Sequence, residues 1–259
     1  LVSGVGHGVL ECASDPDAFD LCPDGSFTYT PDATFTGFDA FTYQLVTGSG
    51  TSQATVTLDA CTGGPTVIVC WQEAAFLARI GEIGYSVFQE GFEDDAVWGM
   101  AREPFTEPWV VSQGIRWASN HPDPPAFNEL TTGDGAARTG LWGLYDPEHG
   151  YATGTAAECD INNPPVTCLL KDGFTGTLEP GGTTLYAAGG HFRGLLQPGL
   201  VMILDGGAPI GLGRLVSGVH QFFGVIDLGG FSSFRTEETD GKVGQARLVF
   251  GDDFVLGTA

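Results

Sequence analysis

The sequence predicts an all-β protein made of two sandwich domains. Forty glycines and fifteen prolines among 259 residues indicate many turns between short strands. Three runs between residues 26 and 58 alternate large or β-branched side chains with small polar ones, which is the period of a half-buried strand. The pattern changes near residue 61, and a chain of this length can bury two cores. We therefore expect domains at residues 1–60 and 85–259.

The first domain has the pattern of antiparallel strands joined by well-defined turns. Asp24-Gly25, Pro31-Asp32 and Thr36-Gly37 supply fixed φ, positive φ and side-chain hydrogen bonds to the backbone. The aromatic residues of this stretch would fill the core of a sandwich. They are Phe27, Tyr29, Phe35, Phe38, Phe41 and Tyr43.

Four motifs of the first domain resemble the bacterial immunoglobulin-like, cadherin-like tandem repeat of large surface adhesins and matrix proteins. They are HGVL at 7–10, DGSFTYTPD at 24–32, GFDAFTY at 37–43 and ATVT at 54–57. The resemblance implies an Ig-like β-sandwich that acts as a spacer, adhesive or assembly module without chemistry of its own.

Repeats of this family begin with one or two strands before the position of Leu1. The resemblance therefore implies a sandwich that is incomplete at its N-terminus and has an open edge. These strands are either cleaved or dispensable, supplied by a further segment of the same chain, or donated by another subunit. We expect donation by another copy of the protein, which builds a surface filament or matrix when repeated head to tail.

The second domain has the pattern of a jelly roll. Strand-like runs recur between acidic turns, at 141–145, 173–178, 184–188, 200–205, 221–227 and 231–236. The opening motif FQEGFEDD at 88–95 and the closing motif ARLVFGDDFVLG at 246–257 resemble jelly-roll (concanavalin-like) domains of MAM-type modules and PEP-CTERM-type surface proteins. The resemblance implies that the first and last strands lie side by side.

In such domains, carboxylates at the ends of these two strands often share a calcium ion. Carried over to this sequence, the resemblance implies Glu93 with Asp252 or Asp253 as ligands, and Asp94 or Asp95 nearby. The alternative is that these acids cap helices, form turns or are solvated.

A second, weaker calcium candidate is the acidic loop at 11–23, with Asp15, Asp17 and Asp20. Hard cations prefer several oxygen ligands, but the loop lacks the full EF-hand spacing. A solvated acidic loop is the alternative.

The six cysteines fall into three neighbouring pairs with no CxxC-type spacing, which disfavours zinc. We expect local disulfides Cys12–Cys22, Cys61–Cys70 and Cys159–Cys168, as in exported proteins. The second pair would clamp a linker at residues 61–84, in which residues 71–80 form a possible short helix. The protein is therefore expected to be extracellular or at the cell surface.

The charge excludes two classes of partner. With 32 acidic and 10 basic residues, the formal charge is −22, so an electrostatic surface for nucleic acid or an anionic membrane is missing. No apolar run approaches the roughly 18 residues of a membrane-spanning helix.

The sequence contains no catalytic constellation. Its five histidines are scattered, no GxSxG motif occurs, and the acids near residue 90 do not alternate as in glycosidases. We expect no enzyme, and an extracellular hydrolase is the remote alternative. Carbohydrate binding is the nearer alternative, because aromatic rings can stack on sugars or else fill the core. The candidates are Trp98, Trp109, Trp117 and Trp142.

Overall fold

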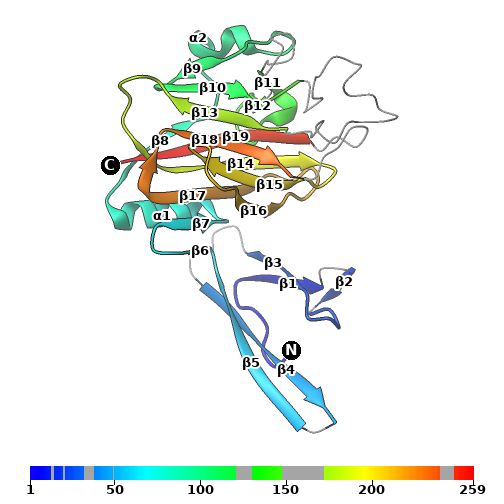
Figure 1. Ribbon diagram of the computed structural model, residues 1–259. Helices are drawn as coiled ribbons and strands as arrows, with labels where there is room; N and C mark the ends of the chain where they lie inside the picture. The colour runs from blue at the N-terminus through cyan, green and yellow to red at the C-terminus, as the bar shows by residue number, and fades with distance from the viewer. Residues whose placement is uncertain are drawn as a thin grey trace.

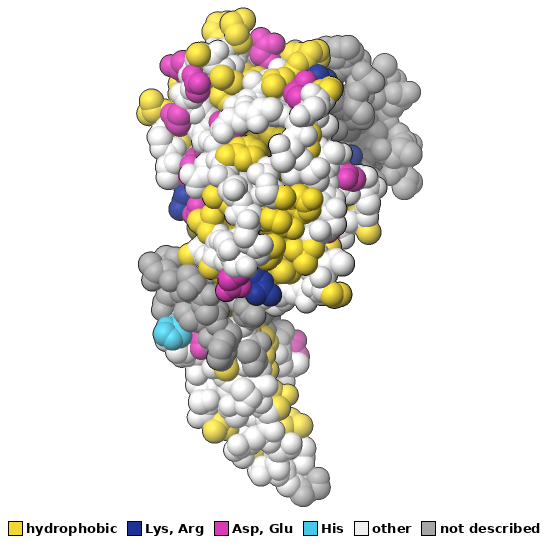
Figure 2. Space-filling model, turned by 90° about the vertical axis from the view of Figure 1, so that its left-hand side faces the viewer, with side chains coloured by type: hydrophobic (Ala, Val, Ile, Leu, Met, Phe, Trp, Pro, Cys, Tyr) yellow, Lys and Arg dark blue, Asp and Glu magenta, His cyan; other side chains and the backbone are white. Residues whose placement is uncertain are grey.

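The computed structural model describes residues 1–12, 15–19, 21–31, 38–48, 50–120, 130–147, 172–239 and 248–259. It confirms a mostly β protein, in which the N-terminal strands form a narrow lobe beside a larger sandwich (Figure 1). Acidic side chains are spread over one face of the larger lobe, where basic side chains are few (Figure 2). Within the described residues, no helix is long and apolar enough to span a membrane.

The first module consists of two small antiparallel sheets. One has the order β2-β1-β3, built from β1 (Gly8–Cys12), β2 (Asp15–Phe19) and β3 (Thr28–Pro31). The other is a hairpin of β4 (Phe38–Thr47) and β5 (Gly50–Asp59), paired in register over its full length. The Cys12–Cys22 disulfide predicted from the sequence is present.

Phe41 and Asp39 organise the packing of the first module. Phe41 is buried and meets Phe27 edge-on, with ring centroids 5.1 Å apart. The Asp39 carboxylate accepts backbone hydrogen bonds from Gly6 and His7 and one from the Tyr29 hydroxyl, at 2.7–3.0 Å. One buried side chain therefore ties the N-terminal segment, β3 and β4 together.

The expected linker at 61–84 is part of the larger sandwich instead. It forms β6 (Cys61–Gly63) and β7 (Val67–Cys70), and β7 pairs with β17 (Gln221–Phe231). The Cys61–Cys70 disulfide is present and joins this hairpin across the strands. Strands of three and four residues around a Thr-Gly-Gly-Pro turn resemble a linker in sequence, which explains the difference.

The helix α1 (Glu73–Ile83) follows, close to the predicted 71–80. It ends at Gly84, whose φ of 88° suits glycine. Phe76 and Ile80 are buried against the outer face of the larger sheet, beside Phe222 and Val255.

The larger domain has two sheets. The six-stranded sheet has the order β16-β15-β18-β13-β10-β9. Its strands are β9 (Val110–Ser112), β10 (Ile115–Ser119), β13 (Phe174–Leu178), β15 (Gly199–Leu204), β16 (Ile210–Arg214) and β18 (Ser233–Glu238).

The eight-stranded sheet has the order β11-β12-β19-β14-β17-β7-β6, and β8 also pairs with β19. Its other strands are β8 (Ser86–Glu90), β11 (Thr131–Gly133), β12 (Gly143–Tyr145), β14 (Leu185–Leu195) and β19 (Leu248–Thr258). The remaining helical turns are α2 (Asp95–Trp98), η1 (Gly99–Ala101) and η2 (Asp134–Ala136). Each of the six predicted strand runs of the second domain overlaps an observed strand.

An aromatic core lies between the two sheets. Phe254 of β19 is fully buried and contacts rings from both layers, including Trp117 of β10 at 4.9 Å between centroids. Its other ring neighbours lie 5.5–6.3 Å away and are Phe92, Phe174, Phe192 and Phe234. The predicted sandwich is thus confirmed.

Candidate functional site

The acidic motifs that open and close the second domain lie together. β8 pairs antiparallel with β19, so Glu90 stands opposite Phe254. The motifs therefore meet at one end of the eight-stranded sheet. Residues 138–142, here called the anchored loop, lie against them.

Glu93 and Asp252 hold the anchored loop through its backbone. An oxygen of Glu93 accepts hydrogen bonds from the N–H groups of Leu141 and Trp142, at 2.9 and 2.8 Å. Asp252 accepts from the N–H groups of Arg138 and Thr139, at 2.6 and 3.1 Å. The two carboxylates thus satisfy four backbone donors of a segment that belongs to none of the strands in the described part of the chain.

Asp253 adds side-chain contacts to the same loop. Its carboxylate pairs with the Arg138 guanidinium at 2.8 Å and accepts from the Thr139 hydroxyl, also at 2.8 Å. Asp253 has a φ of 47°, an uncommon value for a residue other than glycine. The pairing of β14 with β19 shifts register at this point, and Asp252 and Asp253 both contact the anchored loop from consecutive positions.

Two residues that the sequence analysis did not single out extend the cluster. Glu73, at the start of α1, lies 3.0 Å from Nε2 of His191 on β14 and 3.9 Å from Arg138. A cavity of about 280 Å³ is lined by Glu73, Gln89, Gly91, Arg138, Thr139 and Asp253. Glu73 and His191 are 118 positions apart, so no local spacing could have indicated this pair.

Burial perturbs two titrating groups of the cluster. Asp252 is inaccessible to solvent, and this burial raises its pKa to about 6, although the N–H groups of Arg138 and Thr139 oppose the shift. Burial likewise lowers the pKa of His191, against the opposing hydrogen bond to Glu73. His191 is therefore neutral at pH 7.

The predicted calcium ligands are only partly brought together. Glu93, Asp252 and Asp253 surround the anchored loop, whereas Asp94 caps α2 by accepting from the Ala96 N–H. Across the described residues, no group of three or more His, Cys, Asp or Glu side chains is arranged to hold a metal ion. In the first module, β2 includes Asp15 and Asp17, but the side chains of those residues, and all of Asp20, lie outside the description. Calcium binding therefore stays a prediction.

The burial of Asp252 predicts a pH dependence of stability. Its folded pKa of about 6 exceeds the ordinary 3.8, so the protonated form favours folding. That stabilisation is complete below about pH 3.8 and is lost as the pH rises through 6. We expect the difference in unfolding free energy between wild type and Asp252→Asn to fall by on the order of 2 kcal/mol between pH 4 and pH 7. Urea unfolding followed by tryptophan fluorescence measures it, and parallel pH curves for the two proteins would contradict the assignment.

The four tryptophans proposed to stack on sugars differ in their exposure to solvent. Trp98 and Trp117 are fully buried in the aromatic core, so their assignment as ligand-stacking residues was wrong. Trp142 packs against the Arg102 guanidinium, 4.3 Å from the ring centroid. Trp109 remains a candidate for ligand stacking, because 52% of its surface is exposed.

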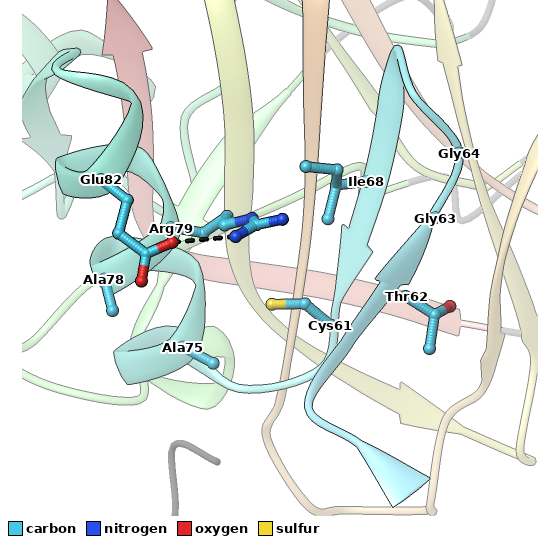
Figure 3. A pocket seen from close by; sticks show the side chains of 9 residues that line it. All are labelled: Cys61, Thr62, Gly63, Gly64, Ile68, Ala75, Ala78, Arg79 and Glu82. Carbon is cyan, nitrogen blue, oxygen red and sulfur yellow. Dashed lines mark hydrogen bonds and ion pairs between the residues drawn. The ribbon is translucent and has the colours of Figure 1, made fainter. Parts of the chain in front are cut away.

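A second cavity, of about 480 Å³, lies between α1 and the β6–β7 hairpin (Figure 3). Its wall combines the Cys61 sulfur with small residues of the helix and the hairpin. Its two charged side chains, Arg79 and Glu82, bind each other at 2.9 Å across one turn of α1. The two charged side chains of this lining therefore neutralise each other.

The expected Cys159–Cys168 disulfide falls outside the described residues and stays a prediction. The other two pairs are confirmed and, with the arrangement of the sheets, are compatible with an exported protein.

Comparison with known proteins identifies only the first module. A family model described as bacterial Ig domain matches residues 8–59. This supports the predicted Ig-like module, and such modules suggest a surface or extracellular structural role. Searches of curated proteins and of solved structures found no match to the chain. The resemblance of the second domain to MAM-type and PEP-CTERM-type domains therefore stays a hypothesis.

Proposed function

We propose that the protein is a non-catalytic structural component of an extracellular surface assembly, and that its Ig-like module contacts a second copy by strand addition. The family match at residues 8–59 and the two disulfides support the extracellular structural role. The contact itself is inferred from one observation, the open edge of β5.

Strand β5 is ten residues long and, among the described residues, pairs only with β4. Thr42 of β4 exchanges backbone hydrogen bonds with Ser3 on the side away from β5. Its register partner Thr55 therefore turns its own N–H and C=O to the opposite side, the open edge of β5. Such an edge is a template for another strand.

The tip of the same hairpin exposes apolar side chains. Leu45 and Val46 are 59% and 69% exposed, on a two-stranded sheet that has little core of its own. A two-stranded hairpin is marginally stable, and a third strand at the open edge of β5 would extend its ladder of backbone hydrogen bonds.

Light scattering over a concentration series tests the proposal. We expect the wild-type chain to self-associate, and Thr55→Pro to remain monomeric because proline removes the outward N–H without breaking the β4–β5 ladder. Thr55→Ala is the matched control, since it keeps the backbone donor and should associate like wild type. Both variants are measured with and without calcium.

Two results contradict strand addition at this edge. The first is a monodisperse wild-type monomer at high concentration in both conditions. The second is an association that Thr55→Pro leaves unchanged. A proline variant that loses the folded first module by circular dichroism is replaced by an edge charge, Thr55→Lys, which keeps the ladder.

A further inference from the structure

Trp109 is an exposed aromatic residue at the edge of the six-stranded sheet. It directly precedes β9, the terminal strand in that sheet, near the upper end of the larger lobe in Figure 1. Along this strand Val110 and Ser112 are buried, whereas Val111 is 43% exposed. By strand alternation, Trp109 and Val111 belong to the outer face of the sheet.

The indole is held in place by a charged pair. The Arg116 guanidinium lies 5.4 Å from the Trp109 ring centroid, and its Nε donates to Glu179 at 2.8 Å. Arg116 stands opposite Val111 in the register, which confirms that it shares the outer face. A ring stacked on a fixed cation loses little side-chain freedom when a ligand binds to it.

The neighbouring strands continue this face with polar groups. Arg116 is opposite Thr177, which is opposite Ser233. One register step along, Arg235 is opposite Thr175 and pairs with Glu237 at 3.1 Å. The outer face therefore presents an exposed indole at its edge, followed by hydroxyl groups, the Arg116–Glu179 pair and Arg235, whose partner Glu237 is buried.

We propose that this outer face binds a neutral polysaccharide, with Trp109 as the stacking platform. The apolar C–H face of a pyranose ring packs on an indole, and sugar hydroxyls bond to fixed polar side chains beside it. The two ion pairs are each charge-balanced, and the whole chain carries −22, which disfavours polyanionic glycans. This activity is independent of the open edge of β5.

Affinity electrophoresis tests the site. The full chain is run through gels containing a soluble β-1,3-glucan, a mixed-linkage β-glucan, xylan, mannan or the anionic polymer alginate. We expect retardation in at least one neutral gel and none in alginate. Trp109→Ala should weaken that retardation about tenfold or more, and Trp109→Phe should lie between the two.

The control is Leu141→Ala, which removes a side chain that is 65% exposed but lies on the anchored loop, just before β12 of the eight-stranded sheet. It should be retarded like wild type. Urea unfolding must give the same midpoint for both alanine variants, so that lost binding is not lost folding. The proposal is overturned if no neutral polysaccharide retards the wild type, if Trp109→Ala is retarded equally, or if alginate binds more strongly.

Discussion

Replacing Phe254 with alanine is expected to lower the unfolding free energy of the second domain by about 3–5 kcal/mol, the range for a fully buried phenylalanine. Phe254 has no exposed surface and contacts five aromatic rings drawn from both sheets and from residue 92. Its removal leaves a cavity whose rigid walls cannot collapse easily.

Urea unfolding followed by tryptophan fluorescence measures the effect, because all five tryptophans lie between residues 71 and 142 and report on this domain alone. Val87→Ala is the control, since that side chain is 45% exposed on β8, a neighbour of β19. It should change stability by at most about 0.5 kcal/mol. A loss below about 1 kcal/mol for Phe254→Ala would show that the two sheets do not pack around this ring.

Replacing Asp39 with alanine is expected to unfold the first module or destabilise it by about 3 kcal/mol. Asp39 is 6% exposed, and its removal takes away the carboxylate acceptor of the Gly6 and His7 N–H groups and one of the two acceptors of the Tyr29 hydroxyl. A module of this size has little stability to lose. Calorimetry should show the loss or downward shift of one transition, while the tryptophan-monitored transition stays in place.

Tyr29→Phe is the matched control, because it keeps the ring and removes only the hydroxyl, which contacts Asp39 and the His7 carbonyl, so a loss of about 1 kcal/mol is expected. Burial would raise the pKa of Asp39, but the hydrogen bonds from Gly6, His7, Ala40 and Tyr29 outweigh it and hold the pKa below 3.8. The stabilisation is therefore complete above about pH 3.8 and is lost as the pH falls through the folded pKa. If Asp39→Ala and wild type show the same melting temperature for the first module, Asp39 does not hold that module together.

The first module was predictable because its signals are local. Strand alternation and the turn residues placed β4 and β5, and the GFDAFTY motif contains both Phe41 and Asp39. The sequence does not show what Asp39 binds, since its partners Gly6 and His7 precede it by more than thirty positions.

For the second domain, the positions of the strands were more predictable than the side chains that face the core. Period-two patterns located most strands, yet the same patterns cannot tell which tryptophan faces the core, and Trp98 and Trp117 do so. The β6–β7 hairpin was assigned to a linker because its strands are too short to show a period. At the candidate site, the acidic motifs were found, whereas Glu73 and His191 meet only through the docking of α1 on the sheet.

The junction of the two domains determines how a pulling force would travel through the molecule. Only Ala60 separates β5 from β6, and its carbonyl accepts a hydrogen bond from the Trp71 N–H at 2.9 Å. Tension applied along β5 enters β6 and crosses the Cys61–Cys70 bond into β7, whose ladder with β17 is then loaded in shear. Because this bond and the backbone carry the load together, the segment between residues 61 and 70 cannot be pulled out to its full length unless the Cys61–Cys70 bond breaks.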